Sequence, residues 1–337
     1  AVLAGGNLNL MDVNISSCTS AKYLDAQLQP GEESDGGGGL FFKGGGAYGK
    51  LTRVRIVECS STGRSSGGAL HAEGVGCRVD VLSSVCEGDF TDGYGGAFYF
   101  YLGAKGYVSD TFFTLCHAND GGAIYSEKAS FTEYTRCNFY RCTSTVFGGA
   151  ATFETEQLSR APAAPMYPNG CWSCNQLPTT SVIMRSCNVT NCISGSGSAM
   201  LIRYDCDVEL VDCHVADCRA TVTDGGAFAV LDLSRVTMTR TDIIDCSARK
   251  YGGAILVSFA RLTTTDCNIL RCAAGLDGGA LAVFVQGSYV RVIGTSISEC
   301  SADSGGGIEV RSGVVLLINQ TKVFSNTASI GDNINAR

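Results

Sequence analysis

The chain repeats one short phrase along its length. The stretch "RCNFYRCTSTVFGGAA" at 136–151 returns as "DCHVADCRATVTDGGAF" at 212–228 and as "DCNILRCAAGLDGGAL" at 266–281. From the third copy onward, successive copies begin 26 to 28 residues apart, except for one step of 49 residues. A fixed period of this size is typical of solenoids, in which each copy forms one turn that stacks on the next.

Each copy contains a Gly-Gly corner followed by alternating apolar residues. The second residue after the pair is apolar in most copies, as in Leu70 and Ile255, and the fourth usually is too. This period of two indicates a strand with one buried face. We expect positive φ at the corner, because the chain must bend tightly there. The pairs, or close variants, begin at Gly38, Gly67, Gly95, Gly121, Gly148, Gly197, Gly225, Gly252, Gly278, Gly305 and Gly331.

These patterns predict an all-β protein, a single parallel β-helix domain over residues 1–337. It would have about eleven rungs of about 27 residues, and no segment reads as a helix. Rungs about 4.8 Å apart give a rod roughly 50 Å long. Two inserted loops interrupt the repeat, at 19–36 and at 154–180. The second holds four of the five prolines and the only tryptophan.

Cysteine recurs at one point of nearly every copy, usually three residues after an apolar residue. Cys86 departs from this rule, with Ser83 at the apolar position, and Asn326 occupies the slot in the last copy. Stacked rungs would bring these residues within disulfide reach. We expect structural disulfides or buried free thiols rather than a metal or redox site. The column predicted is Cys18, Cys59, Cys86, Cys116, Cys142, Cys192, Cys218, Cys246, Cys272 and Cys300.

Eighteen cysteines favour an oxidising, extracellular compartment. Three N-glycosylation sequons, at Asn14, Asn188 and Asn319, agree with a eukaryotic secreted protein. In the second insert, Cys171 and Cys174 form "CWSC", which we expect to be a disulfide-pinned loop.

Composition argues against two classes of partner. A net charge of −7 and a pI near 5.0 argue against nucleic acid, and no apolar run is long enough for membrane insertion. The start, "AVLAGGNLNL", lacks the features of a signal peptide, so we expect a mature or trimmed piece of a longer precursor.

The segment "FSNTASIGDNI" at 324–334 and the many GGAI and GGAL turns resemble the repeats of the chlamydial polymorphic membrane proteins. The resemblance implies a right-handed parallel β-helix of the pectin-lyase-like superfold, a surface location and adhesive roles. Here the FxxN motif of that family is mostly replaced by [IVF]xxC. The cysteine enrichment and the sequons also depart from the family.

No catalytic constellation is evident, so we expect no enzyme activity, no cofactor and no metal. The histidines at 71, 117 and 214 fall in different copies and recur in no motif. A polysaccharide lyase or hydrolase is the less favoured alternative, because such enzymes use scattered acidic and basic residues on the outer face of a β-helix.

One outward column is less polar than exposure to solvent would favour. It includes Tyr99, Tyr125, Leu201 and Leu256. Two explanations stay open: an insert covers the column, or the column is a lateral contact with another protein.

The ends of the repeat suggest how the chain functions. They look like nearly complementary halves of one turn, and an uncovered β-helix end is an open strand edge that invites pairing. We therefore predict a subunit of an extracellular filament of the flagellar-hair or sheath-fibre type, which assembles head to tail with itself or continues a longer solenoid. A monomeric surface adhesin that binds glycans is the alternative.

Overall fold

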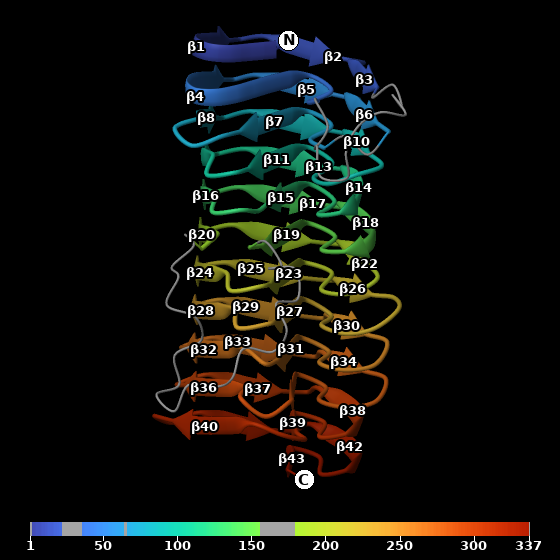
Figure 1. The fold of residues 1–337 in the computed structure, drawn as a ribbon. Helices are drawn as coiled ribbons and strands as arrows, with labels where there is room; N and C mark the ends of the chain where they lie inside the picture. Colours follow the sequence, from blue (N-terminus) through green and yellow to red (C-terminus); the bar gives the residue numbers. More distant parts are fainter. Residues whose placement is uncertain (1, 22–35, 64–65, 156–178, 337) are drawn as a thin grey trace.

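The protein folds as a rod of stacked rungs, with its two terminal rungs at opposite ends (Figure 1). The computed structural model describes residues 2–21, 36–63, 66–155 and 179–336. Within these ranges every strand pairing is parallel and no helix is present. The predicted all-β solenoid is therefore confirmed.

Three sheets form the walls of the rod. The first, of 21 strands, contains two strand columns that the long strands β1 (Val2–Met11) and β4 (Leu40–Thr52) join. The column after the Gly corner continues with β7 (Leu70–Glu73), β11 (Phe98–Tyr101), β15 (Ile124–Ser126), β19 (Ala151–Glu154), β23 (Met200–Arg203), β27 (Phe228–Leu231), β31 (Ile255–Ser258), β35 (Leu281–Phe284), β39 (Ile308–Val310) and β43 (Ile334–Ala336). The second column continues with β8 (Arg78–Leu82), β12 (Lys105–Ser109), β16 (Phe131–Thr135), β20 (Ser181–Arg185), β24 (Asp207–Val211), β28 (Arg235–Thr239), β32 (Arg261–Thr265), β36 (Tyr289–Ile293) and β40 (Val314–Ile318).

The second and third sheets have eleven strands each, which matches the expected number of rungs. The second sheet consists of β2 (Asn14–Ser16), β5 (Arg55–Val57), β9 (Val85–Glu87), β13 (Phe112–Thr114), β17 (Asn138–Tyr140), β21 (Asn188–Thr190), β25 (His214–Ala216), β29 (Asp242–Ile244), β33 (Asn268–Leu270), β37 (Ser296–Ser298) and β41 (Lys322–Phe324). The third consists of β3 (Thr19–Ala21), β6 (Ser60–Thr62), β10 (Phe90–Thr91), β14 (His117–Asp120), β18 (Thr143–Phe147), β22 (Ile193–Ser194), β26 (Arg219–Ala220), β30 (Ser247–Ala248), β34 (Ala273–Ala274), β38 (Ser301–Ser304) and β42 (Thr327–Ile330).

The Gly-Gly corner links the third sheet to the first. From Gly67 to Gly331 the first glycine of each corner has positive φ, for example 66° at Gly95, as expected. The first copy differs from the expectation: Gly38 has no positive φ and occupies the position of the second glycine, stacked on Gly68. The second glycine of the corner has no room for a side chain: a Cβ on Gly96 would lie 2.1 Å from the carbonyl oxygen of Gly122 on the next rung. The corner therefore needs one glycine for its backbone conformation and the other for close stacking.

Two further bends turn each rung between the sheets without glycine in most copies. In each bend a single residue has φ near +50°, as Asp110 does before the second sheet (51°) and Leu115 before the third (56°). Non-glycine residues rarely adopt this conformation, so something on each rung must stabilise it. Both bends are followed by a small buried residue whose hydrogen bonds supply that stabilisation, as described below.

Inward side chains of all three sheets form one continuous core from Leu40 to Ile308. Each residue stacks on its counterpart in the next rung; the rings of Phe113 and Phe139, for example, stack with centroids 4.8 Å apart. Each insert begins after its predicted first residue, because β3 extends to Ala21 and β19 to Glu154. Strand β3 occupies 19–21, and Thr180 Oγ1 donates to the Glu154 carbonyl oxygen at 2.8 Å, which closes the base of the second insert.

Candidate functional site

The cysteine column follows the bend before the third sheet, but its membership differs from the prediction. Strand β9 pairs with β5 so that Cys86 lies opposite Ile56, in the apolar column of the second sheet. The slot below Cys59 belongs to Asp89, 30 residues further along the chain. Assigning Cys86 to the column was therefore wrong. The other nine predicted cysteines hold their places, and the main ladder is Cys18, Cys59, Asp89, Cys116, Cys142, Cys192, Cys218, Cys246, Cys272, Cys300 and Asn326.

Hydrogen bonds connect the rungs along the main ladder. Cys272 Sγ contacts the carbonyl oxygens of Leu270, in its own rung, and Ile243, in the rung above, at 3.5 and 3.7 Å. The backbone N–H of Cys272 points at Cys300 Sγ, 3.4 Å away. Each ladder cysteine can therefore donate to a carbonyl oxygen of its own rung or of the rung above, and accept a backbone N–H from the rung above.

Sixteen cysteines lie in the described ranges, and all of them are free thiols, fifteen of them buried. Burial raises the pKa of the Cys59 thiol to about 12, and burial also raises the pKa of Cys86 well above its usual value. Of the two structural roles expected for the column, the structure thus shows buried thiols that pack and hydrogen-bond. The loop cysteines Cys171 and Cys174 lie outside the described residues.

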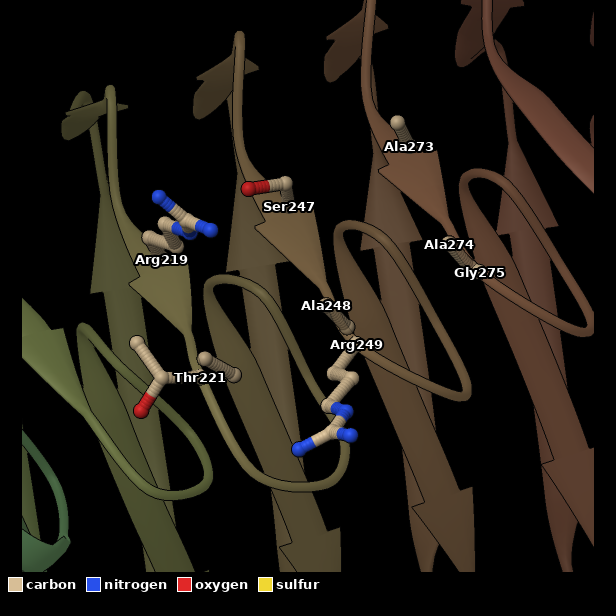
Figure 2. Close-up of a pocket in the computed structure, with 9 residues that line it drawn as sticks. Arg219, Thr221, Ser247, Ala248, Arg249, Ala273, Ala274 and Gly275 are labelled. Atoms are coloured by element: carbon tan, nitrogen blue, oxygen red, sulfur yellow. The ribbon is translucent and has the colours of Figure 1, made fainter.

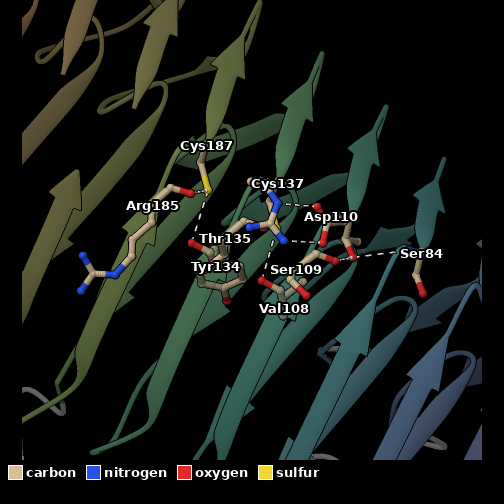
Figure 3. A network of polar contacts seen from close by, with 11 residues as sticks. Ser84, Val108, Ser109, Asp110, Tyr134, Thr135, Cys137, Arg185 and Cys187 are labelled. Atoms are coloured by element: carbon tan, nitrogen blue, oxygen red, sulfur yellow. Dashed lines mark hydrogen bonds and ion pairs between the residues drawn. The ribbon is translucent and has the colours of Figure 1, made fainter. Parts of the chain in front are cut away.

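A second ladder follows the bend between the first and second sheets. Cys137 and Cys187 belong to it, on successive rungs (Figure 3), and Cys187 Sγ donates to the carbonyl oxygens of Arg185 and Tyr134, both at 3.4 Å. After Val13 and Val54, which have no donor, Ser, Thr and Cys replace one another along this ladder, because each has one donor and little volume. Its members are Val13, Val54, Ser84, Thr111, Cys137, Cys187, Cys213, Thr241, Cys267, Thr295 and Thr321.

Asp89 is the one carboxyl group in the main ladder. Its Oδ1 accepts the backbone N–H of Cys59 at 2.9 Å, while its buried Oδ2 has no hydrogen-bond partner. Burial raises the pKa of Asp89 to about 8. The side chain is therefore stable in this place chiefly as the neutral acid.

Exposed Asp–Arg pairs bridge neighbouring rungs at the bends. Arg136 Nε lies 2.6 Å from Asp110 Oδ1, and the hydrogen bonds from this guanidinium hold the pKa of Asp110 below its usual range. Comparable pairs join Asp12 to Arg53, Asp212 to Arg240 and Asp245 to Arg271. These bidentate contacts fix the register of residues that adopt positive φ.

The sequon asparagines Asn14, Asn188 and Asn319 are all exposed. Asn188 is also the donor of a hydrogen bond, from Nδ2 to Asn138 Oδ1 at 2.8 Å. All three positions are sterically open to a glycan, which leaves the glycosylation prediction standing.

The lateral-contact candidates are not on the surface. Tyr99, Tyr125, Leu201 and Leu256 are 2, 1, 0 and 5 % exposed. The prediction that they form an accessible apolar stripe therefore needs correction. The ring of Tyr94 covers part of this column, with its centroid 4.6 Å from the ring centroid of Tyr125. The alternative explanation, coverage by an insert, falls largely on residues outside the described ranges.

A cluster of partly buried charged residues lies on β19 and β23, where Glu154 and Arg203 form a largely buried ion pair. The guanidinium of Arg203 also lies 4.9 Å from the ring centre of Phe147. Nearby, burial raises the pKa of Asp120 to about 6. Because Arg203 neutralises Glu154 and packs on an aromatic ring, we interpret the cluster as a contact that stabilises the fold.

Among the described residues, no three His, Cys, Asp or Glu side chains are placed to hold a metal ion, and no helix is long and apolar enough to cross a membrane.

The terminal rungs leave inward-facing side chains partly uncovered. Leu317 on β40 and Ile334 on β43, the last strands of their columns, are 42 and 43 % exposed although their partners Val292 and Ile308 are buried. Among the described residues, β1, β2 and β3 pair on one side only, as do β41, β42 and β43.

The sequence suggested that the two ends are complementary halves of one turn, and the structure shows that they are not. The start of β1 pairs with Phe41–Lys43 in the column after the Gly corner, and β43 belongs to that same column. Both ends therefore carry the same strand of the rung.

Comparison with known families agrees with this architecture. A family model described as a right-handed β-helix region matches residues 173–331. No curated protein matches the chain. The match supports a right-handed β-solenoid.

Proposed function

We propose that the chain is an extracellular structural protein whose rods join end to end into a cell-surface filament. The observation that carries this proposal is that, among the described residues, the first and last rungs have strands from all three sheets that pair on one side only. Unpaired backbone groups and half-covered apolar side chains at such edges favour the addition of another rung.

A second copy supplies the matching surface. In the second sheet, the inward column begins with Ile15 and ends with Val323, both partly buried members of the core. Stacking β2 of one copy on β41 of another would place these two residues in contact, as Ile297 and Val323 are within one chain. A contact between different ends that does not close produces a filament.

Both ends of the chain carry a strand of the same column, the one after the Gly corner, and this limits how two copies can stack. In a stack without a gap, β43 of one copy and residues 2–4 of the next would compete for one position, so one of these short segments must leave it. The rest of the contact, through β2, β3 and the second half of β1, is unaffected.

The test is assembly of the full chain, expressed in a secretory eukaryotic host and kept unreduced. Light scattering and negative-stain electron microscopy should show fibres one rod wide. Val323→Glu should prevent them, because it places a charge in the end-to-end contact. Lys322→Glu, on the outward side of the same strand, is the matched control and should leave them intact.

Single rods for the unaltered protein at tens of micromolar would overturn the proposal and favour the monomeric adhesin. Loss of fibres in Lys322→Glu but not in Val323→Glu would also overturn it, since the contact would then be lateral. Circular dichroism on each variant separates a failure to assemble from a failure to fold.

A further inference from the structure

The last Gly corner of the chain differs from the earlier ones at two positions. Most earlier corners read Gly-Gly-Ala, as at 252–254, whereas the last reads Gly331-Asp332-Asn333. The pairing of β39 with β43 places Asp332 at the position of the second glycine and Asn333 at the position of the alanine. Both residues are exposed, and β43 is the last strand of its column in the described part of the chain. The two substitutions thus lie at the C-terminal end of the rod.

In the corners that another rung covers, the second position has no room for a carboxylate. A Cβ on Gly306 would lie 2.4 Å from the carbonyl oxygen of Thr327 and 2.5 Å from that of Asp332, both on the next rung. Ser198 is an exception at this position, and its hydroxyl donates to the carbonyl oxygen of Gly226 on the next rung. A carboxylate has no proton to donate, so Asp332 would repel a carbonyl oxygen stacked on it. Asp332 therefore opposes the addition of another rung.

Asp332 also satisfies a backbone donor that a further rung would otherwise satisfy. Ala328 continues a column of alanines in the third sheet, and two of these, Ala248 and Ala274, lie on neighbouring rungs in Figure 2. The carbonyl oxygen of Ala248 accepts the N–H of Gly275, on the next rung, at 3.2 Å. The N–H and C=O groups of one residue point to the same side of a strand, so both groups of these alanines face the next rung. At the end of the described stack, Asp332 Oδ1 accepts the N–H of Ala328 at 2.8 Å instead.

Asn333 occupies the place that the ladder side chain of a further rung would take. In the main ladder, the N–H of Cys300 donates to Asn326 Oδ1 on the next rung at 2.9 Å. The N–H of Asn326 donates to Asn333 Oδ1, 3.3 Å away, and Asn326 Nδ2 donates to the same oxygen at 3.1 Å. In an end-to-end stack of β2 on β41, Cys18 of the second copy is the ladder residue that would face this N–H. Asn333 and Cys18 would therefore compete for one position.

A third side chain of this segment, Asn335 on β43, is fixed to the preceding rung. Its Nδ2 donates to Ser304 Oγ at 2.9 Å and to Glu309 Oε2 at 2.8 Å. Ser304 and Glu309 are themselves buried and joined by a hydrogen bond of 3.0 Å. Side-chain hydrogen bonds at three positions thus hold the segment against the end of the rod.

We propose that residues 331–336 form a C-terminal cap, which keeps this end of the rod closed until a second copy of the chain displaces it. The inference rests on the proposed end-to-end assembly and concerns its regulation. Displacement would free the N–H groups of Asn326 and Ala328 and vacate the column position that residues 2–4 of the second copy take in a continuous stack. Only rods with the cap displaced accept a second copy, so the cap raises the protein concentration that assembly requires.

The test restores the repeat at this corner. Asp332→Gly/Asn333→Ala gives Gly-Gly-Ala-Ile, as at 252–255, and removes both acceptors of the cap. Light scattering of the full chain should then show fibres at a concentration about tenfold below that of the unaltered protein. Asp303→Gly, on β38 of the preceding rung, is the matched control. It removes the same charge but leaves the cap in place, so the concentration should not change.

Amide hydrogen exchange tests the cap in dispersed rods, independently of assembly. The amides of Asn326 and Ala328 should exchange about tenfold faster in the double variant than in the unaltered protein or the control. The amide of Thr327 is the internal reference, because it donates to the carbonyl oxygen of Cys300 at 2.9 Å and does not contact the cap.

Two results would overturn the cap: unchanged exchange of both amides in the double variant, or fibres that form at the same concentration in the double variant and the control. Faster exchange of these amides without fibres in any of the three proteins would support the cap and overturn the filament instead. Thermal melts establish that each variant is folded.

Discussion

Asn326 accepts a hydrogen bond from the backbone N–H of Cys300 through Oδ1, at 2.9 Å. Its Nδ2 donates to the Ile297 carbonyl oxygen at 3.2 Å, the contact that ladder cysteines make with Sγ in the other rungs. The thiol of cysteine and the amide of asparagine thus make the same two hydrogen bonds at this bend. The resemblance between the [IVF]xxC and FxxN motifs has its physical basis here.

The second ladder predicts how a cysteine can be replaced. Cys213 lies between Cys187 and Thr241 in that ladder. Cys213→Thr should lower the free energy of unfolding by less than about 1 kcal/mol, because the hydroxyl keeps the donor. Valine has nearly the same volume as threonine but no donor, so Cys213→Val should lower the free energy of unfolding by about 1–3 kcal/mol. Denaturant unfolding measures both, and equal costs would contradict a hydrogen-bonding role.

Asp89 predicts a pH dependence with a definite sign. Its pKa is about 8 in the folded protein and near 3.9 in the unfolded chain, so the folded state keeps a proton that the unfolded state loses. Its contribution to stability is complete below about pH 4 and falls progressively up to about pH 8. Asp89→Asn keeps both hydrogen-bonding positions, as Asn326 shows.

Asp89→Asn should therefore raise the free energy of unfolding at pH 8, by on the order of 2–4 kcal/mol, and leave it nearly unchanged at pH 4. Unfolding curves between these pH values measure the difference. The exposed Asp303→Asn is the control, with no such trend expected. A gain at pH 8 no larger than in this control would contradict the burial of a neutral carboxyl group.

The Gly corner predicts a contrast between two glycines. A Cβ on Gly253 would lie 2.1 Å from the carbonyl oxygen of Gly279, so Gly253→Ala should cost more than about 4 kcal/mol or prevent folding. Gly44 has a φ of 87° but no atom near its Cβ position, so Gly44→Ala should cost only about 1 kcal/mol. Thermal unfolding of both variants distinguishes clash from backbone strain.

Thiol labelling tests whether the cysteines of the two ladders are free thiols or disulfides. Native protein should resist alkylation at the described cysteines between Cys116 and Cys300, because these thiols are buried and their neighbours shield them. Unfolded, unreduced protein should be alkylated at every one of them. Mass spectrometry of the peptides reads out each position, and protection that persists after unfolding would reveal disulfides.

Glycosylation is checked at the three exposed sequons. Expression in a secretory host followed by enzymatic removal of N-glycans should convert Asn14, Asn188 and Asn319 to aspartate. Single Asn→Gln variants should each lose one glycan without loss of stability, since all three side chains are exposed. Unmodified asparagine at all three sites would contradict a secreted protein.

The sequence was sufficient to predict the architecture, because each rung repeats the same pattern of buried residues. It misplaced Cys86 because the step from Cys59 to Cys86 equals the mean period, whereas the true register step is 30 residues. The apolar residue three positions before the slot was the better signal, since Cys86 itself fills that position relative to Asp89. Local side-chain chemistry thus defined the register better than spacing did.

Other features left no usable signal in the sequence. The bend residues with positive φ include Arg, Glu, Leu and Asp, whose side chains say nothing of that conformation. Only the four cysteines of the second ladder stood out in the sequence, at 137, 187, 213 and 267, because Ser, Thr and Val occupy its other positions. The burial of Tyr99 and Tyr125 depends on what packs over an outward face, which the alternation of a strand cannot reveal.

A charge at Asp89 also affects how the rod comes apart. Each rung contacts only its neighbours, so a weakened contact between two rungs is not compensated elsewhere. When Asp89 ionises, a charge whose Oδ2 has no hydrogen-bond partner is buried between the rungs on either side of it, which weakens the contact between them. Heating should then give one transition in acid and two above pH 8, with the N-terminal rungs melting first. Protonation of a single carboxyl group would determine whether the molecule is one cooperative unit or two.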